Sequence, residues 1–134
     1  MTYLLWTLQA LLAALFLTAG AMKLITPIDA LTDLIPLPGL LIRFVGVAEI
    51  LGGLGLILPS LLRIQPRLVV YAAIELAHIM VGAALVTIVV EDPLSALMPI
   101  AVGAVALFIA YGRSRLAPQS SSRRRPTAFQ PAAG

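Results

Sequence analysis

Residues 68–90 read LVVYAAIELAHIMVGAALVTIVV, and Glu75 is the one formally charged side chain among them. A bilayer core of about 30 Å needs about 20 mostly apolar helical residues to cross it. The run is continuous and rich in Leu, Ala and Val, whereas a membrane-spanning β-strand alternates in polarity over about 10 residues. We therefore expect residues 68–90 to form a transmembrane helix.

Three other stretches have the same length and character. They lie at about residues 3–22, 40–58 and 94–111. The expected fold class is therefore all-α: an integral membrane four-helix bundle formed by a four-span transmembrane domain at residues 1–117.

Proline and its neighbours mark the ends of these spans. Pro38-Gly39 precedes the second span, and Pro59 is expected to close it. Pro66 opens the third span, and Asp92-Pro93 is expected to supply an N-cap and a first-turn proline to the fourth.

The composition of the whole chain agrees with a membrane protein. Of its 134 residues, 60% are hydrophobic and 11% are charged. So few charges cannot cover a water-facing surface, which excludes a soluble enzyme, a coiled coil and a nucleic-acid-binding domain. The absence of cysteine excludes disulfides, thiolate metal sites and cysteine nucleophiles.

The connection between the first two spans has the pattern of a short helix. Thr26 is its expected N-cap, followed by Pro27 at the first helical position and Asp29 in the first turn. Its apolar face is formed by Ile28, Leu31, Leu34 and Ile35. We expect this helix to lie in the membrane interface.

Residues 118–134 consist mainly of Gln, Ser, Arg, Pro and Ala, which predicts a disordered basic tail. The tail either adheres to anionic lipid or serves only as a topology signal.

The basic residues predict the orientation, because they stay on the cytoplasmic side of a membrane. The loop between spans two and three and the C-terminal segment carry seven of the nine: Arg63, Arg67, Arg113, Arg115, Arg123, Arg124 and Arg125. Both termini are therefore expected in the cytoplasm. The alternative is cleavage of the first span as a signal peptide after Ala19-Gly20-Ala21, although the N-terminal segment lacks a basic region and the apolar run is long.

A few polar residues lie in or beside the spans, and these are the candidates for ligand binding or proton handling. An ionisable side chain at mid-depth costs about 2.5 to 3.5 kcal/mol on insertion scales, so it normally faces the bundle interior. The candidates are Gln9, Lys23, Arg43, Glu49, Tyr71, Glu75 and His78. Arg43 is expected either to pair with Asp29, Asp33 or Glu91 or to bind an anionic head group. No residue is assigned as catalytic or as a metal ligand.

Helical periodicity predicts how these residues meet. Tyr71, Glu75, His78 and Gly82 form one stripe, and Gly46, Glu49 and Gly53 form another. Because spans two and three are antiparallel, Glu49, Glu75 and His78 are expected to share a polar cluster in the core. That cluster is either a contact that fixes helix packing or a site for protons or a ligand. Glu75-x-x-His78 also has the spacing of half a di-iron site, which only a symmetric dimer would complete.

Two sequence blocks resemble a known family. Residues 19–24, AGAMKL, close the first span, and residues 43–59, RFVGVAEILGGLGLILP, form most of the second; Met80 and Gly82-Ala83-Ala84 follow in the third. Together they resemble the DoxX-like family of small four-helix membrane proteins, over about residues 5–117. The resemblance implies a four-helix bundle in the bacterial inner membrane, with Lys23, Arg43 and Glu49 as the shared polar residues. Members often have a histidine where this chain has Thr87-Ile88, and they usually lack Glu75.

The resemblance also implies a function. Some relatives form the quinone-reducing membrane part of thiosulfate oxidation, others associate with redox partners, and a eukaryotic branch acts in receptor assembly. We therefore expect a redox-associated membrane subunit that binds a quinone or another lipid-soluble ligand in a polar pocket of the bundle. The alternative is a non-catalytic assembly or structural partner of another membrane protein. A transporter ranks third, because no span is broken and no inverted repeat is present.

The expected partners are the lipid bilayer, a redox or other membrane protein, and further copies of the chain in a homo-oligomer. Nucleic acid is not expected, and no cofactor is assigned.

Overall fold

The computed structural model describes residues 2–65 and 67–116. These residues form α1 (Thr2–Ile25), α2 (Ile28–Leu34), α3 (Gly39–Leu61), α4 (Arg67–Val90), α5 (Leu97–Tyr111) and a π-helical segment, η1 (Gly112–Leu116). No β-strand occurs among them, and four of the helical segments are long and apolar enough to cross a membrane. The prediction of an all-α, four-span protein is confirmed. Pro66 and the predicted tail at residues 118–134 lie outside the described residues.

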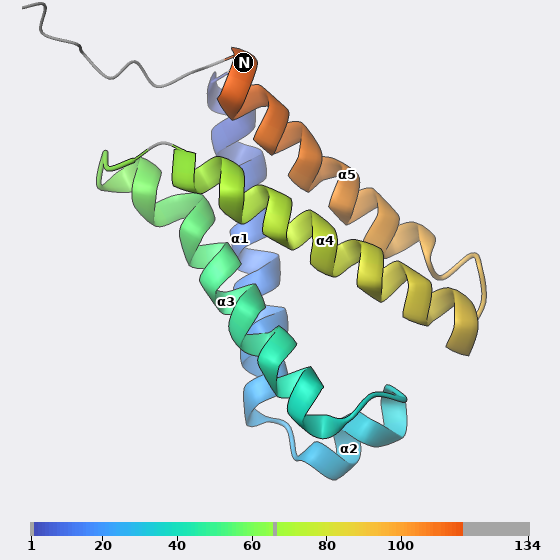
Figure 1. The fold of residues 1–134 in the computed structure, drawn as a ribbon. Helices are drawn as coiled ribbons and strands as arrows, with labels where there is room; N and C mark the ends of the chain where they lie inside the picture. The colour runs from blue at the N-terminus through green and yellow to red at the C-terminus, as the bar shows by residue number, and fades with distance from the viewer. Residues whose placement is uncertain (1, 66, 117–134) are drawn as a thin grey trace, which may run out of the picture.

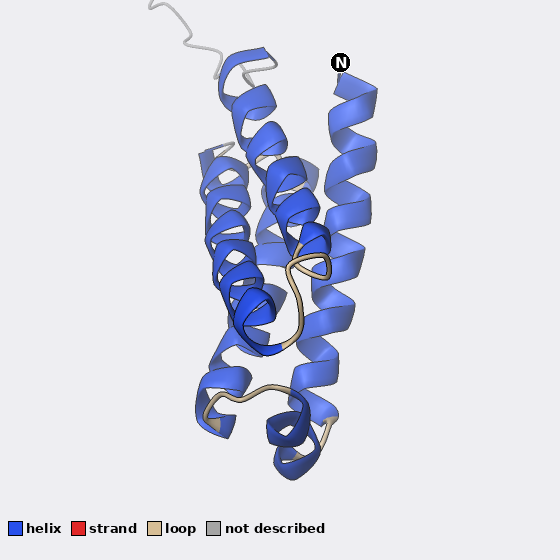
Figure 2. Cartoon of the chain, turned by 90° about the vertical axis from the view of Figure 1, so that its right-hand side faces the viewer, coloured by secondary structure: helices blue, strands red, loops and turns tan. Residues whose placement is uncertain are grey.

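The four long helices run up and down in two pairs. α1 packs along α3 and α4 packs along α5, while contacts between α3 and α4 join the pairs. The start of α1 and the end of α5 lie at one end of the bundle, and α2 lies at the other (Figures 1 and 2). The largest fully buried apolar side chains include Phe16, Leu56, Leu76 and Ile109, one from each long helix.

The outer surface of the bundle is apolar. Large hydrophobic side chains are exposed on every long helix, among them Leu11, Phe44, Val89 and Leu107. Such a surface is stable against lipid hydrocarbon and would aggregate in water. The chain is therefore a multi-pass membrane protein.

Two helix ends differ from the sequence prediction. Pro59 does not end α3, which continues to Leu61. Proline lacks an N–H and so removes the hydrogen bond to the Gly55 carbonyl, but at this position the remaining residues keep helical geometry. In the short helix α2, Pro27 and not Thr26 occupies the N-cap position, and no side chain caps that end.

The fourth span begins later than predicted because Asp92 stabilises a turn before it. One carboxylate oxygen of Asp92 accepts hydrogen bonds from the backbone N–H groups of Ser95 (2.9 Å) and Leu94 (2.8 Å). The other oxygen accepts from the Ser95 hydroxyl at 2.8 Å. These bonds, led by the one from the Ser95 backbone, lower the pKa of Asp92 below its ordinary value. The regular helix α5 then starts at Leu97.

The short helix α2 rests on the start of α3. Leu31 is its buried residue, whereas Ile28 and Leu34 are largely exposed. The Ile28 side chain fills the space beside Gly39, where an added Cβ would lie 2.5 Å from the Ile28 Cγ2 atom. Contact with this glycine holds α2 across the end of the bundle (Figure 1).

Candidate functional site

The site begins with a close crossing of α1 and α3 at two glycines. A Cβ atom added to Gly20 would lie 2.6 Å from the Gly46 carbonyl oxygen. Conversely, a Cβ added to Gly46 would lie 3.1 Å from the Gly20 carbonyl oxygen and 2.9 Å from the Lys23 Cβ atom. Only residues without a side chain allow the two backbones to approach this closely.

This crossing brings Lys23 of α1 to Glu49 of α3. The Lys23 ammonium Nζ lies 3.0 Å from Oε1 and 2.8 Å from Oε2 of Glu49, so it donates to both carboxylate oxygens. The Glu49 side chain is 3% exposed and that of Lys23 is 23% exposed. Helical side chains lean toward the start of their helix, which directs the lysine from the last turn of α1 into the bundle. The result is an ion pair in which the Glu49 carboxylate is buried and the Lys23 side chain is partly exposed.

Arg43 of α3 binds the C-terminal end of α1. Its Nη2 donates to the Thr26 carbonyl oxygen at 2.8 Å, and its Nη1 donates to the carbonyl oxygens of Lys23 and Leu24. The last carbonyl groups of a helix have no partner within the helix and carry partial negative charge, which a guanidinium neutralises well. Asp29, Asp33 and Glu91 make no ion pair with it in the described part of the chain. The expected side-chain ion pair is therefore replaced by a helix cap.

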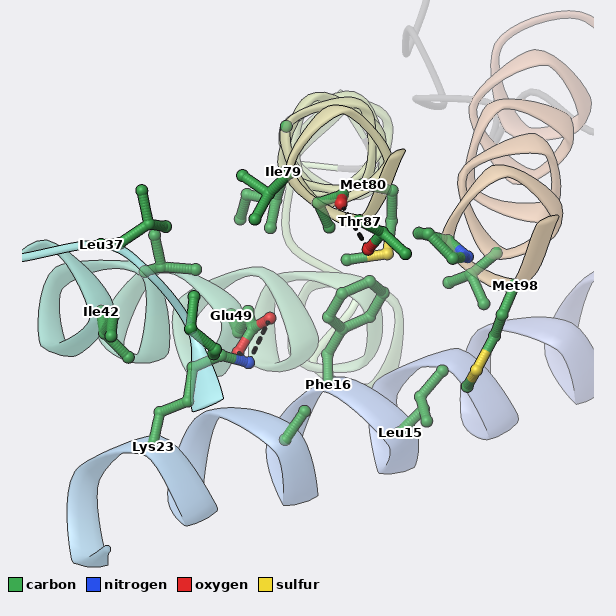
Figure 3. A pocket seen from close by; sticks show the side chains of 18 of the residues that line it. Leu15, Phe16, Lys23, Leu37, Ile42, Glu49, Ile79, Met80, Thr87 and Met98 are labelled. Atoms are coloured by element: carbon green, nitrogen blue, oxygen red, sulfur yellow. Dashed lines mark hydrogen bonds and ion pairs between the residues drawn. The ribbon is translucent and has the colours of Figure 1, made fainter. Parts of the chain in front are cut away.

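A cavity of about 590 Å³ lies beside the ion pair, toward the α2 end of the bundle. All four long helices and the connection after α2 contribute to its wall. Lys23, Glu49 and Thr87 are its polar residues, and most of the others are aliphatic or aromatic. Figure 3 shows Phe16 rising from α1 toward α4, with the ion pair on one side of it and Thr87 and Met98 on the other. This volume is within the range of small-molecule sites, about 300 to 1,000 Å³.

The sequence profile of the DoxX-like family matches residues 7–109. The chain belongs to the DoxX-like family. Among curated proteins and among solved structures, no match to the chain is found.

The residues that carry the DoxX-like resemblance lie together in the structure. Gly20 meets Gly46, Lys23 pairs with Glu49, and Arg43 caps the end of α1. Residues 19–24 of α1 and residues 43–59 of α3 thus contact each other where the two helices cross. Thr87, where other members often have histidine, lines the cavity next to it.

The predicted cluster of Glu49, Glu75 and His78 is wrong for this DoxX-like protein. Glu75 and His78 are exposed on the outer side of α4, as is Tyr71. The buried face of α4 consists of small and aliphatic residues: Val69, Ala72, Ala73, Leu76, Ala77 and Ala84. Leu76 packs onto Gly52 of α3, and this fit turns the polar stripe of α4 outward. Glu49 therefore finds its partner on α1.

The sequence held a signal for the correct partner. Gly20 and Lys23, like Gly46 and Glu49, are three residues apart, so each charge lies on the same helix face as its glycine. The predicted stripe of Gly46, Glu49 and Gly53 faces inward, because all three residues are buried, and Gly20 of α1 is buried against it.

Gln9 belongs to a separate polar group near the other end of the bundle. It is fully buried, donates to the Leu56 carbonyl oxygen at 2.6 Å, and accepts from Nε of Arg113 at 2.5 Å. The Arg113 guanidinium also lies over the Trp6 ring, 5.5 Å from its centroid. The sequence analysis used Arg113 only as one of the cytoplasmic cations, and the structure shows that its side chain is buried, with 7% exposed. Gln9 ties α1, α3 and η1 together and does not line the cavity.

A metal site within one chain has no support in the described residues. No group of three His, Asp or Glu side chains in residues 2–65 and 67–116 could hold a metal ion.

Proposed function

We propose that this protein is a redox-associated membrane subunit that binds a quinone, or a lipid-soluble ligand of similar chemistry, beside Lys23 and Glu49. The observation that carries the proposal is an apolar cavity of about 590 Å³ with one buried ion pair in its wall. Sites of this type hold a ligand by apolar contact and orient it through a few polar groups.

The apolar part of the cavity suits a ring or a hydrocarbon tail. Phe16 and Ile42 are almost completely buried, and Met80 and Val102 are partly buried around the same space. Methionine adapts to irregular shapes and makes favourable contacts with aromatic rings. A lipid-soluble molecule enters this space from the bilayer, so the gain on binding comes from close packing against these side chains and not from leaving water.

The ion pair supplies the polar contacts that a quinone needs. An ammonium group has three N–H donors, and two of those of Lys23 are used on Glu49. The third is free to donate to a quinone carbonyl, and the Glu49 carboxylate has lone pairs left to accept from a quinol hydroxyl. Reduction of a quinone to a quinol takes up two electrons and two protons. The electrons would come from a partner oxidoreductase and the two protons from the aqueous phase, with the 23% exposed Lys23 as the more accessible member of the ion pair.

Binding of a short-tailed benzoquinone to the protein in lipid nanodiscs tests this proposal. Ala83→Phe places a ring in the cavity wall and should weaken binding at least tenfold, because the ring fills the ligand's space. The double variant Lys23→Gln with Glu49→Gln keeps the shape and removes the charges. It should weaken binding about tenfold, since hydrogen bonds to charged groups contribute about 1.5 to 3 kcal/mol.

Val81→Phe is the matched control for Ala83→Phe, because Val81 is 59% exposed on the same helix and does not line the cavity. It should bind the quinone like the wild type. Equal binding by the wild type and Ala83→Phe, or no binding by the wild type, would contradict a quinone site in this cavity.

We also propose that the protein lies in the bacterial inner membrane with both termini in the cytoplasm. In support, the start of α1, the segment after α3 with Arg63, and η1 with Arg115 belong to the same end of the bundle (Figures 1 and 2). The acidic turn with Glu91 and Asp92 joins α4 and α5 away from that end. Basic residues are retained on the cytoplasmic side.

Reporter fusions test the orientation. Alkaline phosphatase fused after Gly134 should be inactive, whereas green fluorescent protein at the same position should fluoresce. Phosphatase inserted between Glu91 and Asp92 should be active and serves as the positive control. N-terminal sequencing should begin at Met1 or Thr2, and a start at Met22 would show instead that the first span is a cleaved signal.

A further inference from the structure

The outer face of α4 carries ionisable groups that the cavity does not use. Glu75 and His78 are exposed, and by helix geometry they lie about 12 and 17 Å along α4 from Arg67. Tyr71 and Gly82 continue the same stripe on either side and are exposed as well; Gly82 also lies at the edge of the cavity. In Figure 1, α4 lies across the front of the bundle with α3 and α5 against it, and no helix of the described residues covers its front.

Hydrocarbon is a poor environment for these side chains. No side chain in residues 2–65 or 67–116 forms a hydrogen bond or an ion pair with Glu75. An acidic or basic group facing lipid at this depth costs several kcal/mol unless it has a partner. A protein surface that supplies such a partner would remove much of this cost.

His78 is oriented to accept a partner from outside. Its Nδ1 lies 2.8 Å from the Ile74 carbonyl oxygen of the preceding helical turn. A carbonyl oxygen can only accept, so Nδ1 carries a proton and donates it. The other ring nitrogen, Nε2, has no hydrogen-bond partner among residues 2–65 and 67–116. A carboxyl group matches it well, either as a proton donor to the neutral ring or as a carboxylate beside the charged ring.

We infer that this stripe is a homodimer interface in which Glu75 of each copy bonds His78 of the other. Two copies inserted in the same direction are related by a two-fold axis along the membrane normal, so their α4 helices run parallel at the same depth. Glu75 and His78 are three residues apart, about 4.5 Å along the axis and on adjacent positions of one face. The two-fold axis therefore produces two equivalent Glu–His contacts, and neither copy retains an unpartnered charge.

Gly82 lets the two helices approach. A Cβ atom added there would meet nothing within 4 Å, so in the described part of the chain no neighbouring helix requires a glycine at this position. Of the other glycines in the long helices, each has a neighbour within that distance. A small residue one turn beyond His78 brings the two backbones close enough for the Glu–His contacts to form.

Cysteine cross-linking tests the interface directly, because the chain contains no cysteine of its own. Gly82→Cys should form a disulfide-linked dimer upon mild oxidation in native membranes. Leu11→Cys, which is exposed on α1 outside the stripe, is the control and should remain monomeric on a non-reducing gel. The proposal would be overturned if Leu11→Cys cross-linked and Gly82→Cys did not, or if neither variant cross-linked.

Charge exchange tests the Glu–His pairing. In nanodiscs or mild detergent, Glu75→His leaves only imidazoles and His78→Glu leaves only carboxyls, so each should weaken self-association about tenfold. The double variant Glu75→His with His78→Glu should regain the wild-type dimer, because the two-fold axis again places an acid opposite a base. Thr18→Leu, an exposed change on α1, should leave association unchanged. A monomeric wild type, recovery of a different membrane protein on α4 instead of a second copy, or failure of the double variant to recover would refute this dimer.

Discussion

Replacing Lys23 with methionine should lower the free energy of unfolding by about 3 kcal/mol, because the Glu49 carboxylate then remains buried without its partner. The loss is large since the Glu49 side chain is only 3% exposed, so little solvent is in contact with its carboxylate. Glu49→Leu should cost less, because the remaining lysine is 23% exposed and its long stem can carry the ammonium group to the interface. Reversible unfolding in mixed detergent micelles, followed by circular dichroism, measures both effects.

The double variant Lys23→Met with Glu49→Leu separates the ion pair from its surroundings. Its free energy of unfolding should lie within about 1 kcal/mol of the wild-type value, because two apolar side chains of similar size replace an ion pair whose desolvation was costly. If the double variant lost as much unfolding free energy as the two single variants together, each residue would stabilise the bundle through other contacts.

Gly20→Val should be the most disruptive single change at the α1–α3 crossing, with a loss of about 3 kcal/mol. Its Cβ would lie 2.6 Å from the Gly46 carbonyl oxygen and 2.8 Å from Cγ1 of Ile50, so the two helices must separate. That separation also moves Lys23 away from Glu49. The same unfolding measurement should therefore give nearly the same loss of unfolding free energy for Gly20→Val as for the double variant Gly20→Val with Lys23→Met.

Gly82→Ala is the matched control for this prediction. It also replaces a helical glycine, but its added methyl group meets nothing within 4 Å. Measured on the monomer, it should stabilise the helix by about 0.5 to 1 kcal/mol, the usual advantage of alanine over glycine. If Gly82→Val lowered the free energy of unfolding as much as Gly20→Val does, the crossing of α1 and α3 would not be a tight contact.

The inward faces of α1 and α3 could be predicted from sequence because each depends on local pattern. Glu49 lies on a face with Gly46 and Gly53, and all three are buried. By contrast, nothing in the sequence near Arg113 indicated burial, because its partner Gln9 is 104 residues away. Contacts of that range depend on where the chain returns in space.

The amino-acid sequence alone determined the number of spans and the membrane environment, because both depend on the length and polarity of continuous segments. The tertiary structure decided which polar groups meet. The rotation of α4 follows from the fit of Leu76 onto Gly52 and of Ala72 onto Gly55, two contacts between different helices. That rotation leaves Glu75 and His78 on the outer surface, and Glu49 forms its ion pair with Lys23. A helix's own periodicity specifies its stripes, but only packing against a neighbour determines which stripe faces inward.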